Sequence, residues 1–304
     1  MLVISTSDKG GTGRSVTSCN IAYRRALSGE DVCYLDFDFG SPTSGAIFGI
    51  EDATHGTKDG GLHQYLQGDL VKPHELDVWR EGNPRSLGPK PGGAGRLVLF
   101  PGDIGGGEFN MDDDVVERCV NLLLRLREEF DLIIMDLSAG RSHAAEMVLT
   151  ATKNAKVQAM GVRWLVFHRW TRQHVSAAAG LVYGERGLID VGMLHGHTED
   201  EMRDMIRFVR TAVVTPDSEG TLGLRATQEA WLQRVNADLN ERAIELELGR
   251  SSVIATVPLD PMLQWREQLL TDKDVHDDVA NAVTVEAFQR LARDVWGTDA
   301  WSRL

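Results

Sequence analysis

A glycine-rich segment near the start of the chain has the residue types needed to bind phosphate groups. Residues 8–15 read Asp-Lys-Gly-Gly-Thr-Gly-Arg-Ser and lie between an apolar run and a helical pattern. They resemble the phosphate-binding loop G-x-x-x-x-G-K-[ST], in which glycines let backbone amides converge on phosphate oxygens beside a helix start. An ordinary glycine-rich turn is the alternative. The predicted phosphate-binding residues are Lys9, Gly10, Gly11, Thr12, Gly13, Arg14, Ser15 and Val16.

Two positions of this loop depart from the pattern. Asp8 replaces the first glycine and places a carboxylate near the phosphates. Arg14 replaces the lysine and keeps its positive charge, but a guanidinium is a wide planar group, whereas lysine is a compact charge on a slim stem. Arginine remains a good phosphate partner. The chemistry most affected by these changes is therefore phosphate hydrolysis, which depends on close placement of the cation.

Three acidic residues follow or end apolar runs. Asp36 comes directly after the apolar residues 32–35, Asp38 lies two residues further on, and Asp136 is the last residue of the run 131–136. The carboxyl ends of parallel strands meet at one edge of a sheet, so we expect these acids to lie beside the loop. Phosphoryl transfer requires a metal ion and an oriented water molecule, which a hydroxyl and carboxylates can hold. Ser15, Asp36 and Asp136 are the predicted Mg²⁺ residues, and solvated strand-end acids are the alternative.

The elements that must position these residues alternate along the chain. Short apolar runs predict buried strands, and apolar residues at helical spacing predict amphipathic helices. The predicted strands are 2–6, 32–35, 97–100, 131–136, 162–167, 208–214 and 253–257, and the predicted helices are 15–27, 115–128, 228–248 and 285–296. This alternation favours an α/β fold with one doubly wound, mostly parallel sheet and helices on both faces. We expect one domain over residues 1–304, with an irregular Gly/Pro-rich loop at 82–96.

Several motifs occur in a fixed order. Residues 9–15 match K-G-G-x-G-K-[ST] except at Arg14, and Asp36-Phe37-Asp38 provides a D-x-D motif. Further motifs are Gly61–Leu66 (GLHQYL), Leu97–Gly102 (LVLFPG), Phe130–Gly140 (FDLIIMDLSAG) and Ile254–Pro261 (IATVPLDP). Together they resemble the ParA/MinD family of P-loop ATPases, with a degenerate Walker A motif. The resemblance covers residues 1–150 well and 250–296 adequately, whereas 155–250 match only in element order.

The resemblance implies roles for individual residues. Lys9 would reach the phosphates of a second subunit across a dimer interface, and Asp38 would position the attacking water; these two are the predicted catalytic residues. Asp136 would be the acid that ends the Walker B strand. Pro258 and Asp260 would lie beside the adenine. The implied cofactors are ATP or ADP with Mg²⁺.

Composition excludes other classes of protein. The 304 residues carry a net charge of −13, which argues against a general nucleic-acid coat. The sequence contains no apolar run long enough to cross a membrane and no secretory signal at its start. Cys19, Cys33 and Cys119 form no CxxC pair, so we expect a reduced, cytoplasmic environment.

Three other features suggest binding roles that we do not favour. Residues 162–186 combine arginines with tryptophans, as some DNA-binding segments do, but the acidity of the chain favours a strand followed by an interface helix. His168, His174, His195 and His197 lack a closing acid or cysteine at metal-site spacing. The predicted helix 285–296 lacks a cationic polar face, so we do not expect it to bind a membrane.

The sequence therefore predicts a nucleotide-binding protein that acts as a dimeric positioning or assembly switch through an unidentified protein partner. Higher polymers remain an alternative to the homodimer, and we expect hydrolysis to be slow or lost because of Arg14. A second hypothesis is a pseudo-ATPase, a scaffold or filament-forming interaction protein that no longer binds nucleotide. In that case Asp8 and Arg14 would pair with each other and fill the phosphate site. A metabolic kinase or synthetase is disfavoured because no second substrate motif is present.

Overall fold

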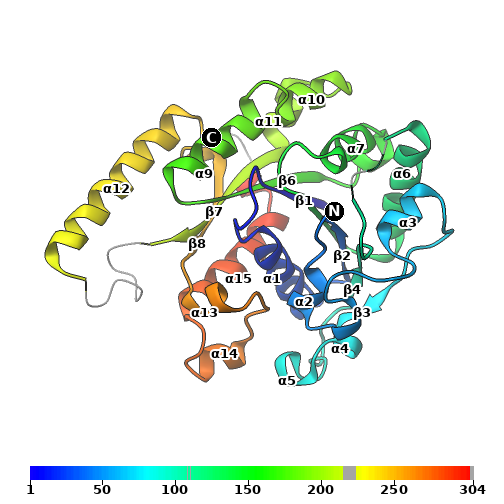
Figure 1. The fold of residues 1–304 in the computed structure, drawn as a ribbon, viewed down its shortest axis with the longest axis horizontal. Helices are drawn as coiled ribbons and strands as arrows, with labels where there is room; N and C mark the ends of the chain where they lie inside the picture. Colours follow the sequence, from blue (N-terminus) through cyan, green and yellow to red (C-terminus); the bar gives the residue numbers. More distant parts are fainter. Residues whose placement is uncertain (108, 110, 215–223, 302–304) are drawn as a thin grey trace.

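A computed structural model describes residues 1–107, 109, 111–214 and 224–301. Its centre is an eight-stranded sheet with the strand order β3-β4-β2-β5-β1-β6-β7-β8 (Figure 1). Every neighbouring pair is parallel except β3 and β4. The strands are β1 (Leu2–Thr6), β2 (Val32–Phe37), β3 (Leu76–Asp77), β4 (Leu97–Phe100), β5 (Leu132–Leu137), β6 (Val162–Arg169), β7 (Ile206–Val213) and β8 (Val253–Pro258). This topology confirms the predicted fold class.

Helices cover both faces of the sheet. One apolar cluster joins it to α3 (Leu62–Gln67), α6 (Asp113–Glu129), α7 (His143–Thr152), α8 (Ala155–Gln158), α9 (Arg172–Tyr183), α10 (Leu188–Leu194), α11 (Glu199–Met205) and α12 (Ala226–Glu245). The other joins it to α1 (Arg14–Leu27), α2 (Ser44–Phe48), α4 (Val78–Glu81), α5 (Pro84–Leu87), α13 (Pro261–Trp265), α14 (Asp272–His276) and α15 (Ala282–Trp296). Short 3₁₀ turns are η1 (Glu51–Ala53), η3 (Arg250–Ser252) and η4 (Asp299–Trp301).

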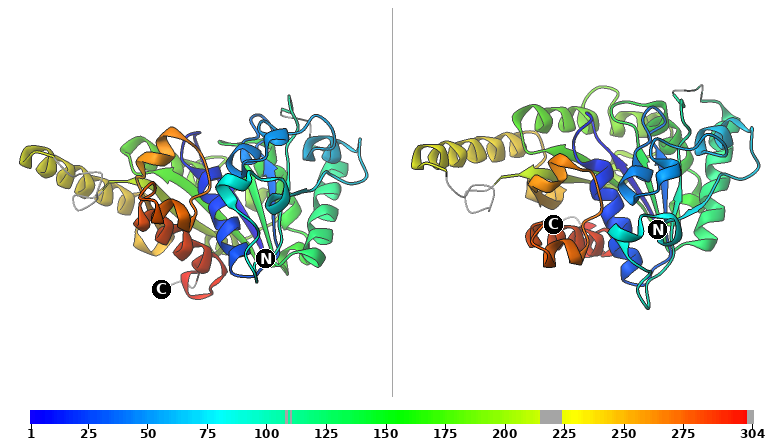
Figure 2. Two further views of the ribbon diagram at one scale, coloured as in Figure 1. Left: turned by 90° about the horizontal axis from the view of Figure 1, so that it is seen from below. Right: turned by 60° about the horizontal axis from the view of Figure 1, so that its bottom comes forward.

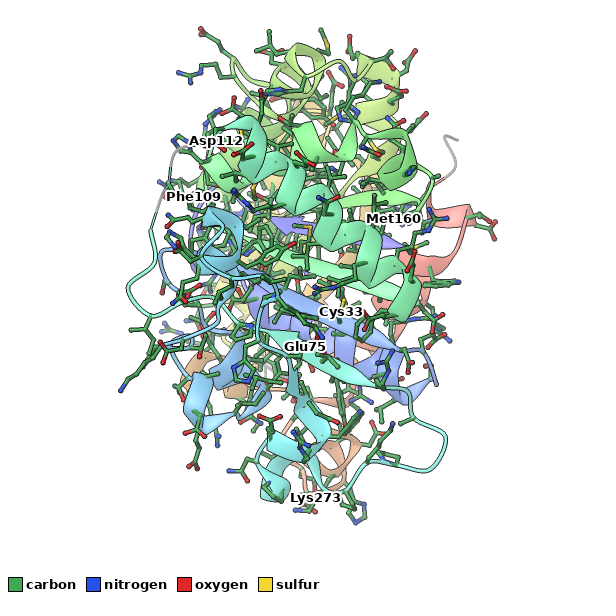
Figure 3. All side chains as sticks on the ribbon, turned by 90° about the vertical axis from the view of Figure 1, so that its right-hand side faces the viewer. Cys33, Glu75, Phe109, Asp112, Met160 and Lys273 are labelled. Carbon is green, nitrogen blue, oxygen red and sulfur yellow. The ribbon has the colours of Figure 1, made fainter. Side chains whose placement is uncertain are left out.

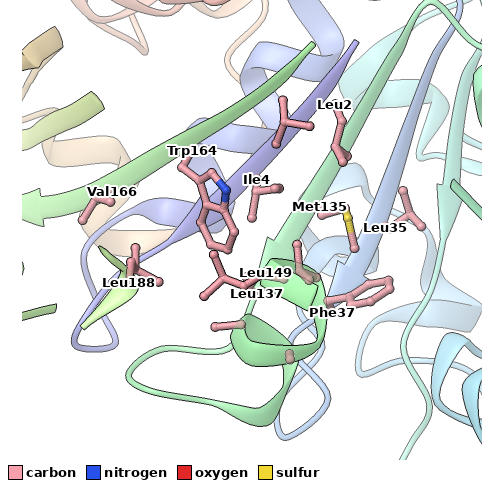
Figure 4. Packing of buried hydrophobic residues seen from close by; sticks show 14 of the residues in the cluster. Leu2, Ile4, Leu35, Phe37, Met135, Leu137, Leu149, Trp164, Val166 and Leu188 are labelled. Atoms are coloured by element: carbon pink, nitrogen blue, oxygen red, sulfur yellow. The ribbon is translucent and has the colours of Figure 1, made fainter. Parts of the chain in front are cut away.

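The strands are buried on both faces because successive side chains enter different clusters. Leu2 and Ile4 pack in the first cluster and Val3 packs in the second. Figure 4 shows Ile4 beside Trp164 of β6, with Leu188 of α10 nearby. Trp164 is fully buried. This burial explains why the central strands are continuous apolar runs in the sequence.

Most predicted elements are present within a few residues of their predicted bounds. Asp112 is the residue before α6 (Figure 3), and its carboxylate caps the helix by accepting a hydrogen bond of 2.9 Å from the amide of Val115. The helix α12 ends at Glu245, three residues before the predicted end at residue 248. The backbone leaves the helical conformation there, since Glu247 has a positive φ of 61°. The loop at 82–96 is irregular except for the single turn α5.

The helix α12 extends away from the rest of the molecule (Figure 2). Its C-terminal half is anchored most firmly: Leu239 and Ala243 are buried and Val235 packs half-buried against the same cluster, whereas Trp231 is 60% exposed. Within the described residues, no helix is both long and apolar enough to cross a membrane.

Burial of His168 should make the protein sensitive to acid. The side chain on β6 is 1% exposed, and burial lowers its pKa from 6.5 to about 4. The unfolded chain binds a proton below pH 6.5 and the folded chain does not, so stability falls as pH drops from 6.5 to 4. The expected loss is about 3 kcal/mol. Denaturant unfolding at several pH values should show this slope, reduced in His168→Phe but kept in the control His55→Phe at an exposed position.

Candidate phosphate-binding site

The loop between β1 and α1 has the backbone shape of an anion site. Gly11 and Gly13 have φ values of +70° and +72°, a region that glycine enters without strain. Gly13 is the residue before α1, and no side chain caps the first amides of this helix. A Cβ atom built on Gly10 or Gly11 would meet no atom within 4 Å, so the loop is open on that side. The free amides can therefore receive an oxyanion.

Neighbouring strands fix this loop through hydrogen bonds. The amide of Gly140, just after β5, donates to the carbonyl of Ser7 at 2.7 Å. On the other side, the hydroxyl of Thr211 on β7 donates to the carbonyl of Thr12 at 2.6 Å. Sequence analysis did not identify Thr211; its only signal is a polar residue within an apolar strand.

The Arg14 side chain extends toward the C-terminal ends of β2 and β5 and forms ion pairs with two of the predicted acidic residues. Its Nε lies 2.5 Å from Oδ1 of Asp136, and one Nη lies 2.9 Å from Oδ2 of Asp38. The remaining guanidinium contacts are to the hydroxyls of Ser7 and Ser15, both at 3.4 Å. Burial by itself lowers the pKa of Arg14, but the two carboxylates outweigh this effect and raise it, so the group stays charged.

The proposed pairing of Asp8 with Arg14 is wrong. The nearest arginine to the Asp8 carboxylate is Arg141, with 3.8 Å between Oδ1 and Nη1. Arg141 follows β5 and also donates to the carbonyl of Gly180. Asp8 and Arg14 leave the loop in different directions, because Arg14 is the first residue of α1 and extends toward the ends of β2 and β5.

Asp36 holds the turn that leads into α2. Its Oδ2 accepts hydrogen bonds from the amides of Thr43 and Ser44 and from the Ser44 hydroxyl, and its Oδ1 accepts one from the amide of Asp38. Burial, with the nearby charge of Asp136 as the second cause, raises the pKa of Asp36 to about 7. Burial also raises the pKa of Asp136, although Arg14 acts in the opposite direction.

This donor set does not fit Mg²⁺ as it is arranged. Both oxygens of Asp36 already accept hydrogen bonds, and the Arg14 guanidinium contacts Asp136 and Ser15. A divalent cation beside this guanidinium would be repelled. Across the described part of the chain, no group of three or more His, Cys, Asp or Glu side chains could hold a metal ion. The Mg²⁺ roles of Ser15, Asp36 and Asp136 therefore stay predictions.

A cavity of about 270 Å³ adjoins the loop. Gly13, Val16 and the end of β8 line it, together with Pro258 and Asp260. Asp260 is 2% exposed and its carboxylate accepts hydrogen bonds from the amides of Met262 and Asn281, so it shapes the cavity wall. Trp265 of α13 is 86% exposed at the rim and was not identified from the sequence.

The remaining predicted catalytic residue, Lys9, is half-buried on the loop. Its ammonium forms no ion pair with the residues that the structure describes, so its charge is available. The structure thus brings the predicted loop, Asp36, Asp38 and Asp136 together at the C-terminal ends of β1, β2 and β5. Pro258 and Asp260 lie at the adjoining cavity.

No protein-family model matches the sequence. Two curated relatives are septum site-determining proteins MinD. That of Bacillus subtilis is 27% identical over 146 residues (45% of each chain), and that of Synechocystis is 28% identical over 143 residues (46% of this chain and 45% of the relative). The aligned part of the chain thus spans less than half the length of these relatives.

Solved structures match over the whole fold. The MinC:MinD cell division complex of Aquifex aeolicus superposes with a TM-score of 0.61 at 16% identity, covering 97% of this chain and 96% of the other. The chain has the MinD/ParA fold. A Pyrococcus horikoshii MinD complexed with Mg-ADP (TM-score 0.52, 15% identity, 100% of each chain) has the same fold. A Borrelia burgdorferi partition protein bound to AMPPNP also has this fold, with a TM-score of 0.57 at 12% identity over 97% of this chain and 98% of the other. The resemblance to MinD/ParA proteins in the sequence is confirmed.

Proposed function

We propose that this protein is a MinD/ParA-like nucleotide-binding switch that holds ATP or ADP and hydrolyses ATP slowly or not at all. The observation that carries nucleotide binding is the open glycine loop beside a cavity, and the observation that carries weak hydrolysis is the double ion pair of Arg14. One guanidinium contacts both Asp136 and Asp38, the two acids that hydrolysis would need.

Nucleotide binding is supported by the loop and the cavity together. Gly11 and Gly13 hold the open loop, and the adjoining cavity has the position expected for a base and ribose. Its volume lies just below the usual range for small-molecule sites, and one side is open to solvent beside Trp265. The related fold of MinD complexed with Mg-ADP makes an adenine nucleotide the ligand of choice.

Weak hydrolysis follows from the positions of the two acids. Asp38 would have to orient a water molecule, and Asp136 would have to hold the ligands of a metal, but both oxygens that face the loop contact Arg14. Breaking these contacts leaves the buried carboxylate of Asp136 and the half-buried carboxylate of Asp38 without this partner, which is costly. The guanidinium already supplies positive charge here, so we expect nucleotide affinity to depend little on Mg²⁺.

The switch would act as a homodimer. Lys9 carries an available charge at the loop and would contact the phosphates of the second subunit. A positioning or partition role through a protein partner then follows by analogy with the MinC:MinD complex and the partition protein. DNA is not the favoured partner because the chain is strongly acidic.

A nucleotide-free scaffold or filament-forming protein is the second candidate. The specific observation in its favour is that Arg14, Asp38 and Asp136 satisfy one another without a ligand. Such a protein would keep the fold and the dimer surface while the ion pairs occupy the site. This second hypothesis predicts that the native chain binds no nucleotide, with or without Mg²⁺.

Calorimetric titration with ADP and ATP, with and without Mg²⁺, separates the two candidates. We expect the native chain to bind ADP with a Kd of roughly 1–100 µM, changed less than about threefold by Mg²⁺. Arg14→Lys should gain both Mg²⁺ dependence and measurable ATP turnover, because a slim ammonium leaves room at Asp136. Arg80→Lys, the same change of residue at an exposed position outside the loop and the adjoining cavity, should behave like the native chain. Absence of binding by both the native chain and Arg14→Lys would refute the switch and leave the scaffold.

A further inference from the structure

The sheet has an open edge at β8. This strand pairs with β7 on one side and ends the strand order on the other, within the described residues. Its residues Val253–Val257 read VIATV, with Val253, Ile254 and Ala255 half-buried and Thr256 exposed. Edge strands of this kind carry unpaired backbone groups that readily accept another strand. No charged residue within the strand blocks such pairing.

A groove of about 770 Å³ follows this edge. One wall is α12, where Ile244 is 70% exposed, and the other is α15, which contributes Ala287 and Arg290. The alternating side chains of an added strand would point toward these two walls. Ile244 and Ile254 supply apolar surface for its uncharged side chains.

The charge of the groove is opposite to that of the chain. Arg210, Arg250 and Arg290 line it, and none of the described residues that line it is acidic, in a chain of net charge −13. Arg250 and Arg290 are exposed. Arg210 is fixed below them, since it donates to the carbonyl of Leu248 at 3.0 Å and lies 4.1 Å from the ring centre of Trp170. No ion pair within 4.0 Å satisfies any of the three arginines among the described residues.

We propose that the groove beside β8 binds an extended acidic peptide segment of a partner protein, which adds a strand to the sheet edge. Backbone pairing would supply affinity, and the three arginines would select carboxylates on the flanks of the segment. A second copy of this chain is disfavoured because its β8 groove has the same lining of three arginines, so the two grooves offer each other no opposite charge. A nucleic acid is disfavoured because the described residues that line the groove include no aromatic side chain for base stacking, and a nucleic acid cannot pair with a strand edge.

The test uses fluorescence anisotropy with the blocked, labelled peptide EEVTVTVEE. The 304-residue chain should bind it saturably. The peptide KKVTVTVKK, or an EEVTVTVEE peptide with alternate N-methylated amides, should bind at least about tenfold more weakly. Hydrogen exchange should slow at the amides of residues 253–257 when the acidic peptide is bound. These measurements involve no nucleotide, so their outcome is independent of the function proposed for the loop.

Variants that reverse the charge of the groove arginines test whether the peptide binds beside β8. The double variant Arg250→Glu/Arg290→Glu should weaken binding of the acidic peptide by at least about tenfold. The control Arg234→Glu/Arg293→Glu changes the net charge equally at exposed positions outside the groove and should stay within about twofold of the native chain. Equal loss in both variants, equal binding of the two charged peptides, or no saturable binding at 1 mM peptide would overturn the proposal. Tighter binding of a labelled single-stranded DNA that competes with the peptide would overturn it in favour of nucleic acid.

Discussion

Replacing Arg14 with alanine is expected to destabilise the protein by about 3–5 kcal/mol, the cost of leaving buried charge without its partner. The side chains of Arg14 and Asp136 are 7% and 2% exposed, and that of Asp38 is 21% exposed. Urea unfolding at pH 7.5 measures this loss as a shift of the midpoint at unchanged slope.

Two variants identify buried charge as the cause. Arg24→Ala is the matched control: Arg24 is equally buried on α1, but its partner Asp272 is 74% exposed and would be solvated after the change. We expect that variant to lose only about 1–2 kcal/mol. Adding Asp136→Asn to Arg14→Ala should recover part of the stability. Equal losses in Arg14→Ala and Arg24→Ala would mean that packing, and not the buried acids, sets the cost.

The Arg14→Ala variant should also differ from the native chain in how its stability depends on pH. Burial is the largest influence on the carboxyl of Asp136 and raises its pKa, and Arg14 is the largest influence that lowers it, so the folded-state pKa should rise further without Arg14. A folded pKa above the unfolded value makes stability fall as pH rises through that interval. The deficit of Arg14→Ala against the native chain should therefore be smaller at pH 5 than at pH 8.

Much of the fold could be predicted because the buried strands leave a strong signal. Residues 132–135 and 97–100 are apolar on both faces, which is typical of strands in a covered parallel sheet. The helices α7 and α9 could not be placed in the same way. Their sequences, HAAEMVLTAT and RQHVSAAAGLVY, contain many alanines, which fit buried and exposed positions alike and blur the helical period.

The candidate site could be predicted in its parts but not in its contacts. Motif order was enough to place Asp36, Asp38 and Asp136 at one sheet edge beside the loop. The sequence could not show which acid Arg14 contacts, because the choice depends on the direction in which the side chain leaves α1. Thr211 was missed because it lies in the segment where the chain resembles its relatives only in element order.

Substitution of Gly13 by valine is expected to weaken ADP binding by at least about 100-fold, since a β-branched residue at a φ of +72° is strained and shifts the loop amides. A Cβ here would lie 3.9 Å from Cβ of Thr211, an ordinary contact, so the effect is due to backbone conformation and not to collision. Calorimetric titration with ADP measures the affinity, and urea unfolding measures the strain, which we expect to cost about 1–3 kcal/mol.

Gly88 offers a control with the same strain at a distant place. Its φ is +67°, and a Cβ built on it meets no atom within 4 Å, yet it lies outside the loop and the adjoining cavity. Gly88→Val should lose similar stability and keep ADP affinity within about twofold of the native chain. If both variants lose binding, general destabilisation is the cause; if neither does, ADP binds elsewhere and the loop is not its phosphate site. Loss in Gly13→Val alone assigns the phosphates to the amides of this loop, because only there does the strained residue alter their direction.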